Sequence, residues 1–248
     1  MQVGAARCLP HVDAVNTHLA ASGDTLHAHA MTLARTLTIP VAGSRFRLEG
    51  RHVAAIGAAR DPQPLALIAP PHPMYGGTFG NPVVRVMEAA LQARGLSTLA
   101  FNFRGTGESE GEPSGEYEDS LADYLGAARA LPTAELSWLT GYSFGSVAAL
   151  ACAIELDAPR VLMVAPPLGM LDPTLLTRYR GLVAVVVGTA DEYAPVEPLQ
   201  ELFGPRPNTT LELLPDVEHF FLGSDVQHLA QGLARLLAQT DSSRPTHA

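Results

Sequence analysis

A serine between two glycines, where an apolar run meets a run of small residues, limits the fold of this chain more than any other feature. Residues 136–150 read LSWLTGYSFGSVAAL, with Ser143 at the centre of GYSFG. A strand that turns abruptly into a helix at a serine leaves no room for side chains two positions before and after it. Gly141 and Gly145 meet that requirement. The segment therefore predicts a strand–turn–helix unit that projects the Ser143 hydroxyl above the carboxyl edge of a sheet.

Short, continuous apolar runs alternate with helical patterns along the rest of the chain. An early antiparallel pair is expected within 37–43 and 45–58, and later strands at 65–70, 96–103, 136–141, 160–167, 182–191 and 209–216. Apolar residues at helical spacing predict helices within 81–95, 117–131 and 225–239. Strands that alternate with helices are typical of βαβ units. We therefore predict an α/β fold with a mostly parallel, doubly wound sheet and helices on both faces.

Length and composition favour one large domain. We expect a weakly structured N-terminal extension at 1–36, an α/β domain at 37–240 and a frayed tail at 241–248. The net charge of −9 argues against nucleic acid and anionic membranes as partners. Two cysteines predict no disulfide scaffold and fit a reducing compartment. No apolar run reaches the ~18 residues of a membrane span, and no clean signal peptide opens the chain, so we expect a cytoplasmic protein.

A nucleophilic serine needs a base, and the base needs an orienting acid. Asp191 ends the apolar run LVAVVVGTA, and His219 follows the run TTLELLP, so both are expected at the carboxyl ends of consecutive strands. His72 is the serious rival as base, but it lies between two prolines that suit it to shaping a loop. Three competing acids do not end a strong apolar strand, and a surface position is expected for them: Asp172, Asp216 and Glu218.

The oxyanion of a serine-catalysed reaction needs two N–H donors. We assign one to the backbone of Phe144, directly after the serine, and the other to Met74, with Tyr75 as a near-equal alternative, in the loop PHPMYGGTFGNP. Tyr75 and Tyr142 are candidate substrate-binding residues. The sequence contains neither H-E-x-x-H nor paired cysteines, so no metal and no cofactor are expected.

Taken together, these segments resemble the α/β-hydrolase superfamily, and more narrowly the small serine hydrolases related to dienelactone hydrolases. The matching blocks, in order, are PHPMYGGT, FNFRGTGESEG, GYSFG, APP, GTADEYAP and EHFF. The resemblance implies Ser143, Asp191 and His219 as the catalytic triad, and implies that residues 104–107 shape a loop. Many such enzymes carry a cap domain after the strand that ends near APP. Residues 166–181 are too few for one, so we expect an open site without a separate cap domain.

The resulting expectation is a carboxylesterase-like serine hydrolase that acts on a small-molecule acyl substrate. A peptidase, a lactone hydrolase or a thioester hydrolase would use the same triad. A non-catalytic binding or scaffold protein is the alternative of another class, because a fold does not by itself give function. The acidic loop 105–120 is read as a solvated surface, with repulsion of anionic substrates as the functional alternative. The sequence leaves the oligomeric state open.

Overall fold

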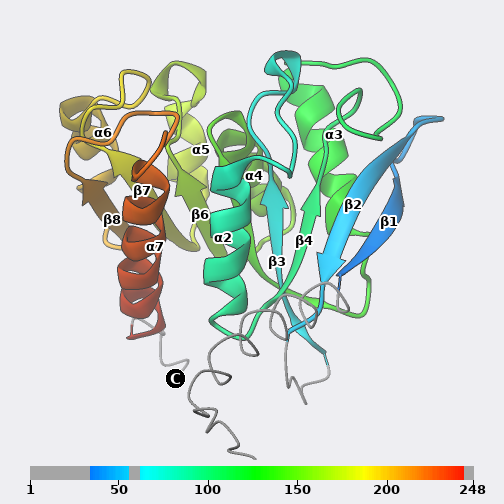
Figure 1. The fold of residues 1–248 in the computed structure, drawn as a ribbon, viewed down its shortest axis with the longest axis horizontal. Helices are drawn as coiled ribbons and strands as arrows, with labels where there is room; N and C mark the ends of the chain where they lie inside the picture. Colours follow the sequence, from blue (N-terminus) through cyan, green and yellow to red (C-terminus); the bar gives the residue numbers. More distant parts are fainter. Residues whose placement is uncertain (1–33, 56–61, 243–248) are drawn as a thin grey trace, which may run out of the picture. The chain divides into compact units, whose positions relative to one another are not determined.

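A computed structural model describes residues 34–55 and 62–242 and places eight strands in one sheet (Figure 1). The strand order across the sheet is β1-β2-β4-β3-β5-β6-β7-β8. From β4 to β8 in this order, every neighbouring pair is parallel. The six parallel strands are β3 (Pro64–Ala69), β4 (Ser97–Phe101), β5 (Glu135–Tyr142), β6 (Arg160–Val164), β7 (Leu182–Gly188) and β8 (Thr209–Leu214). The predicted mostly parallel sheet is confirmed.

The two early strands lie at one side of the sheet. They are β1 (Ala34–Pro40) and β2 (Arg47–Val53), and β2 pairs antiparallel with β4. Most of the predicted extension, and most of the predicted tail, lies outside the described residues. The last residues of the predicted extension, from Ala34, belong to β1. The first residues of the predicted tail, up to Ser242, belong to α7.

Helices cover both faces of the sheet. On one face lie α2 (Pro82–Gln92) and α7 (Asp225–Ser242), which stand in front of the sheet in Figure 1. The other face carries α3 (Tyr117–Ala128), α4 (Phe144–Glu155), α5 (Pro173–Arg178) and α6 (Val196–Phe203). Helix α2 begins after a side-chain N-cap and is followed by a glycine with positive φ. The Asn81 side chain accepts the Val83 N–H at 2.8 Å, and Gly95 adopts a φ of 76° beyond its end.

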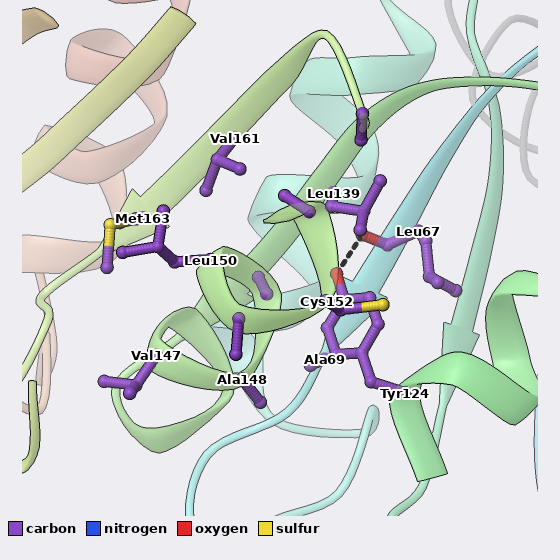
Figure 2. Close-up of a cluster of buried hydrophobic side chains, with 14 of the residues drawn as sticks. Leu67, Ala69, Tyr124, Leu139, Val147, Ala148, Leu150, Cys152, Val161 and Met163 are labelled. Atoms are coloured by element: carbon purple, nitrogen blue, oxygen red, sulfur yellow. Dashed lines mark hydrogen bonds between the residues drawn. The ribbon is translucent and has the colours of Figure 1, made fainter. Parts of the chain in front are cut away.

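Helix α4 lies at the centre of the core, and its first ten residues are all buried. Small residues such as Ala148 let it pack closely against β5 and β6 (Figure 2). Beside it, the buried Tyr124 hydroxyl bonds to the carbonyls of Leu67 at 3.2 Å and Thr140 at 2.8 Å. Burial raises the pKa of the nearby Cys152 thiol to about 12, so this cysteine remains a neutral core residue and is no rival nucleophile.

The connection between β6 and β7 contains only short elements. A 3₁₀ turn, η2, spans Leu168–Met170, and α5 is six residues long. The expected absence of a separate cap domain here is confirmed. No separate domain in this connection therefore covers the carboxyl edge of the sheet, where β5 ends.

Candidate active site

The candidate site is centred on the turn between β5 and α4, which we call the elbow (residues 141–145). Ser143 has a φ of 52° and a ψ of −123°, a region that residues with a side chain rarely occupy. Its N–H donates to the Val164 carbonyl at 2.9 Å, which anchors the turn to the neighbouring strand β6. Such strain persists only when the surroundings impose it, and it concentrates at functional sites. The predicted strand–turn–helix unit is present.

The two elbow glycines are required by close backbone contacts. A Cβ atom on Gly141 would lie 2.1 Å from the Gly145 carbonyl oxygen. A Cβ atom on Gly145 would lie 2.3 Å from the carbonyl oxygen of Pro70, directly after β3. The elbow and the loop after β3 are thus in backbone contact, and this contact brings the predicted oxyanion loop to the site.

Gly145→Ala is therefore expected to lower the free energy of unfolding by roughly 3 kcal/mol, the upper end of the usual cost of overpacking. The reason is that two backbone segments, rather than a flexible side chain, must move apart. Gly169→Ala is the matched control, because nothing lies within 4 Å of its added Cβ. Urea unfolding of both variants measures the difference. Equal midpoints for the two variants would contradict the steric reading of the elbow.

Asp191 and His219 come to the elbow on the loops after β7 and β8. Those loops are bound to each other, since the Ala190 N–H donates to the Val217 carbonyl at 3.0 Å. His219 Nε2 lies 3.0 Å from Ser143 Oγ. On the other side of the ring, Nδ1 lies 2.8 Å and 3.0 Å from the two carboxylate oxygens of Asp191. The structure thus brings together the three residues that the sequence predicted.

The surroundings of Asp191 fix its orientation and that of the imidazole. Its Oδ1 accepts the backbone N–H groups of Tyr193 at 2.9 Å and Ala194 at 3.1 Å. Asp191 is 3% exposed and His219 is 6% exposed. A carboxylate can only accept, so the ring proton belongs on Nδ1. Nε2 then carries the lone pair that faces the Ser143 hydroxyl, which is the arrangement a general base requires.

Tyr142 occupies a different position from the predicted one. It is 3% exposed, and its hydroxyl donates to the backbone carbonyl of His219 at 2.9 Å. Burial, followed by the nearby Asp191 charge, raises the pKa of this hydroxyl well above its usual value, so it stays a neutral donor. The side chain therefore ties the His219 loop to the elbow, and little of it is exposed to solvent.

The predicted oxyanion donors differ in their present partners. Phe144 is the first residue of α4, where a helix offers its N–H no internal acceptor. In the loop after β3, the 3₁₀ turn η1 spans Pro73–Tyr75. There the Met74 N–H donates to His72 Nδ1 at 3.2 Å, and the Tyr75 N–H donates to the His72 carbonyl at 3.2 Å. The His72 ring also packs on the Phe144 ring, with centroids 4.5 Å apart, so His72 links the predicted oxyanion loop to the start of α4.

The loop after β4 is held by Arg104, as the resemblance implied. Its guanidinium pairs with Asp119 and, at 2.8 Å, with Asp123, and its backbone N–H donates to Asp123 at 2.9 Å. Glu110 of the same loop accepts the Arg47 N–H at 2.9 Å. Some acids of the predicted acidic loop thus have structural partners.

Two aromatic residues at the site were not singled out from the sequence. Tyr193 and Phe220 both contact the His219 ring, with centroid separations of 4.6 Å and 5.3 Å. Their position in the sequence could have indicated them, because Tyr193 lies two residues after Asp191 and Phe220 directly follows His219. Within the described ranges, no three His, Cys, Asp or Glu side chains are grouped for a metal ion. Nor does any helix there have the length and apolarity needed to cross a membrane.

The fold and the geometry of the site are those of an α/β hydrolase, and sequence comparison gives the same class. The sequence profile described as "Alpha/beta hydrolase family" matches residues 67–245. The chain belongs to the alpha/beta hydrolase family.

Individual relatives place it among small members of that class. The chain is 30% identical over 139 residues to the uncharacterized protein RP471 of Rickettsia prowazekii, a match that covers 52% of this chain and only about half (55%) of that relative. Its fold is similar to XC6422 of Xanthomonas campestris, a serine hydrolase without a lid. That likeness has a TM-score of 0.71 and 27% identity, and covers 86% of this chain and 98% of the other.

A more distant likeness shows the fold alone. Est1E of Butyrivibrio proteoclasticus, whose structure holds ferulic acid, is similar at a TM-score of 0.70 and 16% identity. The alignment covers 84% of this chain and all of Est1E (100%).

Proposed function

We propose that this protein is a serine hydrolase that cleaves carboxylic esters through an acyl-enzyme on Ser143. The observation that carries the proposal is the line of hydrogen-bonding distances from Ser143 Oγ through the His219 ring to Asp191, at 3.0 Å and 2.8 Å. It supports a serine made nucleophilic by a base whose tautomer a buried carboxylate fixes. The strained backbone of Ser143 and the kinship with serine hydrolases add to that support.

The reaction follows from these positions. Ser143 Oγ attacks the ester carbonyl while His219 Nε2 takes the hydroxyl proton, and a tetrahedral oxyanion forms. The oxyanion collapses, the bond to the alcohol oxygen breaks, and His219 returns the proton to the departing alcohol. A water molecule then attacks the acyl-enzyme, again giving its proton to His219. The acid leaves and the proton returns to Ser143, so the enzyme is restored.

For the oxyanion we assign the Phe144 N–H and the Met74 N–H as donors. The Met74 N–H presently donates to the neutral His72 side chain over 3.2 Å, a long hydrogen bond. An oxyanion is the stronger acceptor, because hydrogen bonds to a charged group are roughly twice as strong. The Tyr75 N–H bonds instead to a backbone carbonyl of its own turn. Its release would break the turn, so Met74 is preferred.

Two other functions use the same residues differently. A peptidase, lactone hydrolase or thioester hydrolase would run the same steps with another leaving group. A binding protein would keep the fold without turnover. The strained backbone of Ser143 and the imidazole aligned with its hydroxyl favour an enzyme over a binding protein, because a binding role would require neither feature.

A fluorophosphonate probe tests the proposal, because it labels only an activated serine. We expect rapid labelling of the wild-type protein and none of Ser143→Ala, with labelling mapped to Ser143 by mass spectrometry. His219→Ala should react far more slowly. Absence of labelling in the folded wild-type protein would favour the binding role and reject the enzyme.

A further inference from the structure

Large apolar side chains gather on one edge of the molecule. In the part of the chain that the structure describes, the exposed ones lie on loops that follow β3, β6, β7 or β8, except Tyr117, which is the first residue of α3 after the β4 loop. These loops surround the elbow at the carboxyl edge of the sheet. Exposed apolar groups cost free energy in water, so a cluster of them around one point marks a binding surface.

Two members of this cluster differ from the others because they touch the imidazole. Tyr193 is 47% exposed and Phe220 is 56% exposed, yet both rings contact His219. Their own centroids lie 6.2 Å apart with planes at 77°, an edge-to-face pair. The backbone of Tyr193 is fixed on both sides, since its N–H donates to Asp191 at 2.9 Å and its carbonyl accepts the Leu168 N–H at 2.9 Å. The two rings thus form a wall, which we call the aromatic wall, beside the imidazole.

The proposed reaction indicates which half of an ester, the acyl group or the alcohol, lies against the aromatic wall. His219 Nε2 must deliver its proton to the oxygen of the departing alcohol, so that oxygen lies at hydrogen-bonding distance from Nε2. The group attached to it then lies beside the rings that contact the imidazole. The acyl group, by contrast, is bonded to Ser143 and remains after the alcohol has left.

We propose that the aromatic wall of Tyr193 and Phe220 binds the alcohol half of the substrate, and that this alcohol is large, apolar and uncharged, such as an aryl-methyl alcohol. This inference rests on the proposed function and names its substrate class. Stacking of an alcohol group on two exposed rings contributes binding free energy through buried apolar area and ring geometry. A methyl group supplies little of that area and no ring.

Charge around the wall argues against an anionic alcohol. Segments 189–195 and 215–224, which carry the two rings, contain four acidic residues and no arginine or lysine. Glu192 and Glu218, next to Tyr193 and His219, are exposed. At low ionic strength these carboxylates repel a negatively charged leaving group, and salt weakens that repulsion.

Two ester series test the proposal. The first keeps the acetyl group and varies the alcohol through methyl, butyl and benzyl, which have alcohols of similar acidity. The second keeps the ethyl alcohol and lengthens the acyl group. We expect wild-type kcat/KM to rise at least about tenfold from methyl to benzyl acetate, a range typical of an apolar subsite. A 4-carboxybenzyl acetate should react several-fold more slowly than benzyl acetate at low salt, with a smaller difference at high salt.

Variants separate binding by the wall from other roles. Tyr193→Ala and Phe220→Ala should each lower the ratio of kcat/KM for benzyl acetate to kcat/KM for methyl acetate about tenfold. Tyr193→Phe should keep the preference, because the ring and not the hydroxyl supplies the contact. Tyr117→Ala is the control, an aromatic residue 43% exposed at the start of α3, and should leave the benzyl-to-methyl ratio unchanged.

Each other outcome overturns the inference in a recognisable way. Equal losses for methyl and benzyl acetate would mean that the rings only position His219. A size dependence in the acyl series alone would move the apolar group to the other half of the ester. Fluorophosphonate labelling of Ser143 without hydrolysis of any of these esters would reject the alcohol class while keeping the serine hydrolase. Absence of labelling would reject the proposed function itself.

Discussion

Substitution of Ser143 by alanine is expected to abolish ester hydrolysis, with kcat lower on the order of 10⁵-fold or more, because the oxygen that carries the acyl group is removed. The only described cysteine, Cys152, is buried and neutral. The fold should be unaffected, since the hydroxyl makes no contact on which the core depends. Its hydrogen-bond partner is His219 Nε2. Steady-state hydrolysis of p-nitrophenyl acetate, with circular dichroism as the check on folding, measures the loss.

The same position should reveal the strain stored in the elbow. At a φ of 52° and a ψ of −123°, a residue with a side chain costs of order 1–3 kcal/mol. Ser143→Ala keeps that cost, so its thermal stability should equal or slightly exceed that of the wild type. Ser143→Gly relieves the strain, and after the entropy lost by glycine on folding it should gain about 1 kcal/mol. That gain corresponds to a Tm roughly 2–4 °C higher for a chain of this size.

Two results would contradict this account of Ser143. Substantial activity in both variants would remove the serine from the mechanism. A less stable glycine variant would show that the backbone at this position is not strained. The alanine variant separates the two questions, because it removes the hydroxyl while leaving the backbone requirement in place.

Loss of the His219 imidazole is expected to lower kcat by about 10³-fold or more, because the nucleophile then has no base. His72→Ala should cost roughly ten- to a hundredfold, through misplacement of the Met74 N–H that its Nδ1 now accepts. Asp191→Asn should fall between these two variants, since the imidazole remains but its tautomer is no longer fixed. The two histidines are thus expected to have different roles. His219 transfers the proton, and His72 positions the oxyanion loop.

All three variants are compared at saturating substrate with an activated ester. His228→Ala is the matched control, because this histidine lies exposed on α7, where its side chain pairs with Asp225 at 3.7 Å. It should keep full activity. If His72→Ala proves more damaging than His219→Ala, the base is misassigned and the mechanism must be rebuilt around the loop after β3.

Sequence patterns predicted most of the fold because burial leaves a direct signal in residue order. Strands covered on both faces are continuous apolar runs, and helices repeat their apolar residues every three or four positions. Boundaries were less exact. β4 ends at Phe101, before the predicted end at 103, and the Asn102 side chain that follows accepts from the Phe79 N–H and donates to the Glu49 carboxylate. Hydrogen bonds to distant residues of this kind leave no periodic trace.

By itself the sequence determined the parallel sheet, the glycine-flanked elbow and the choice of Ser143, Asp191 and His219 as candidates. It could do so because each of the three lies within a few residues of the end of an apolar run, and the carboxyl ends of parallel strands share one edge. Only the tertiary structure decided that Tyr142 supports the His219 loop, a contact between residues 77 positions apart. It also decided that Tyr193 and Phe220 flank the imidazole. The physical reason is that residue order encodes which side chains are buried, whereas side-chain partners depend on strand register and loop packing, which the whole domain sets together.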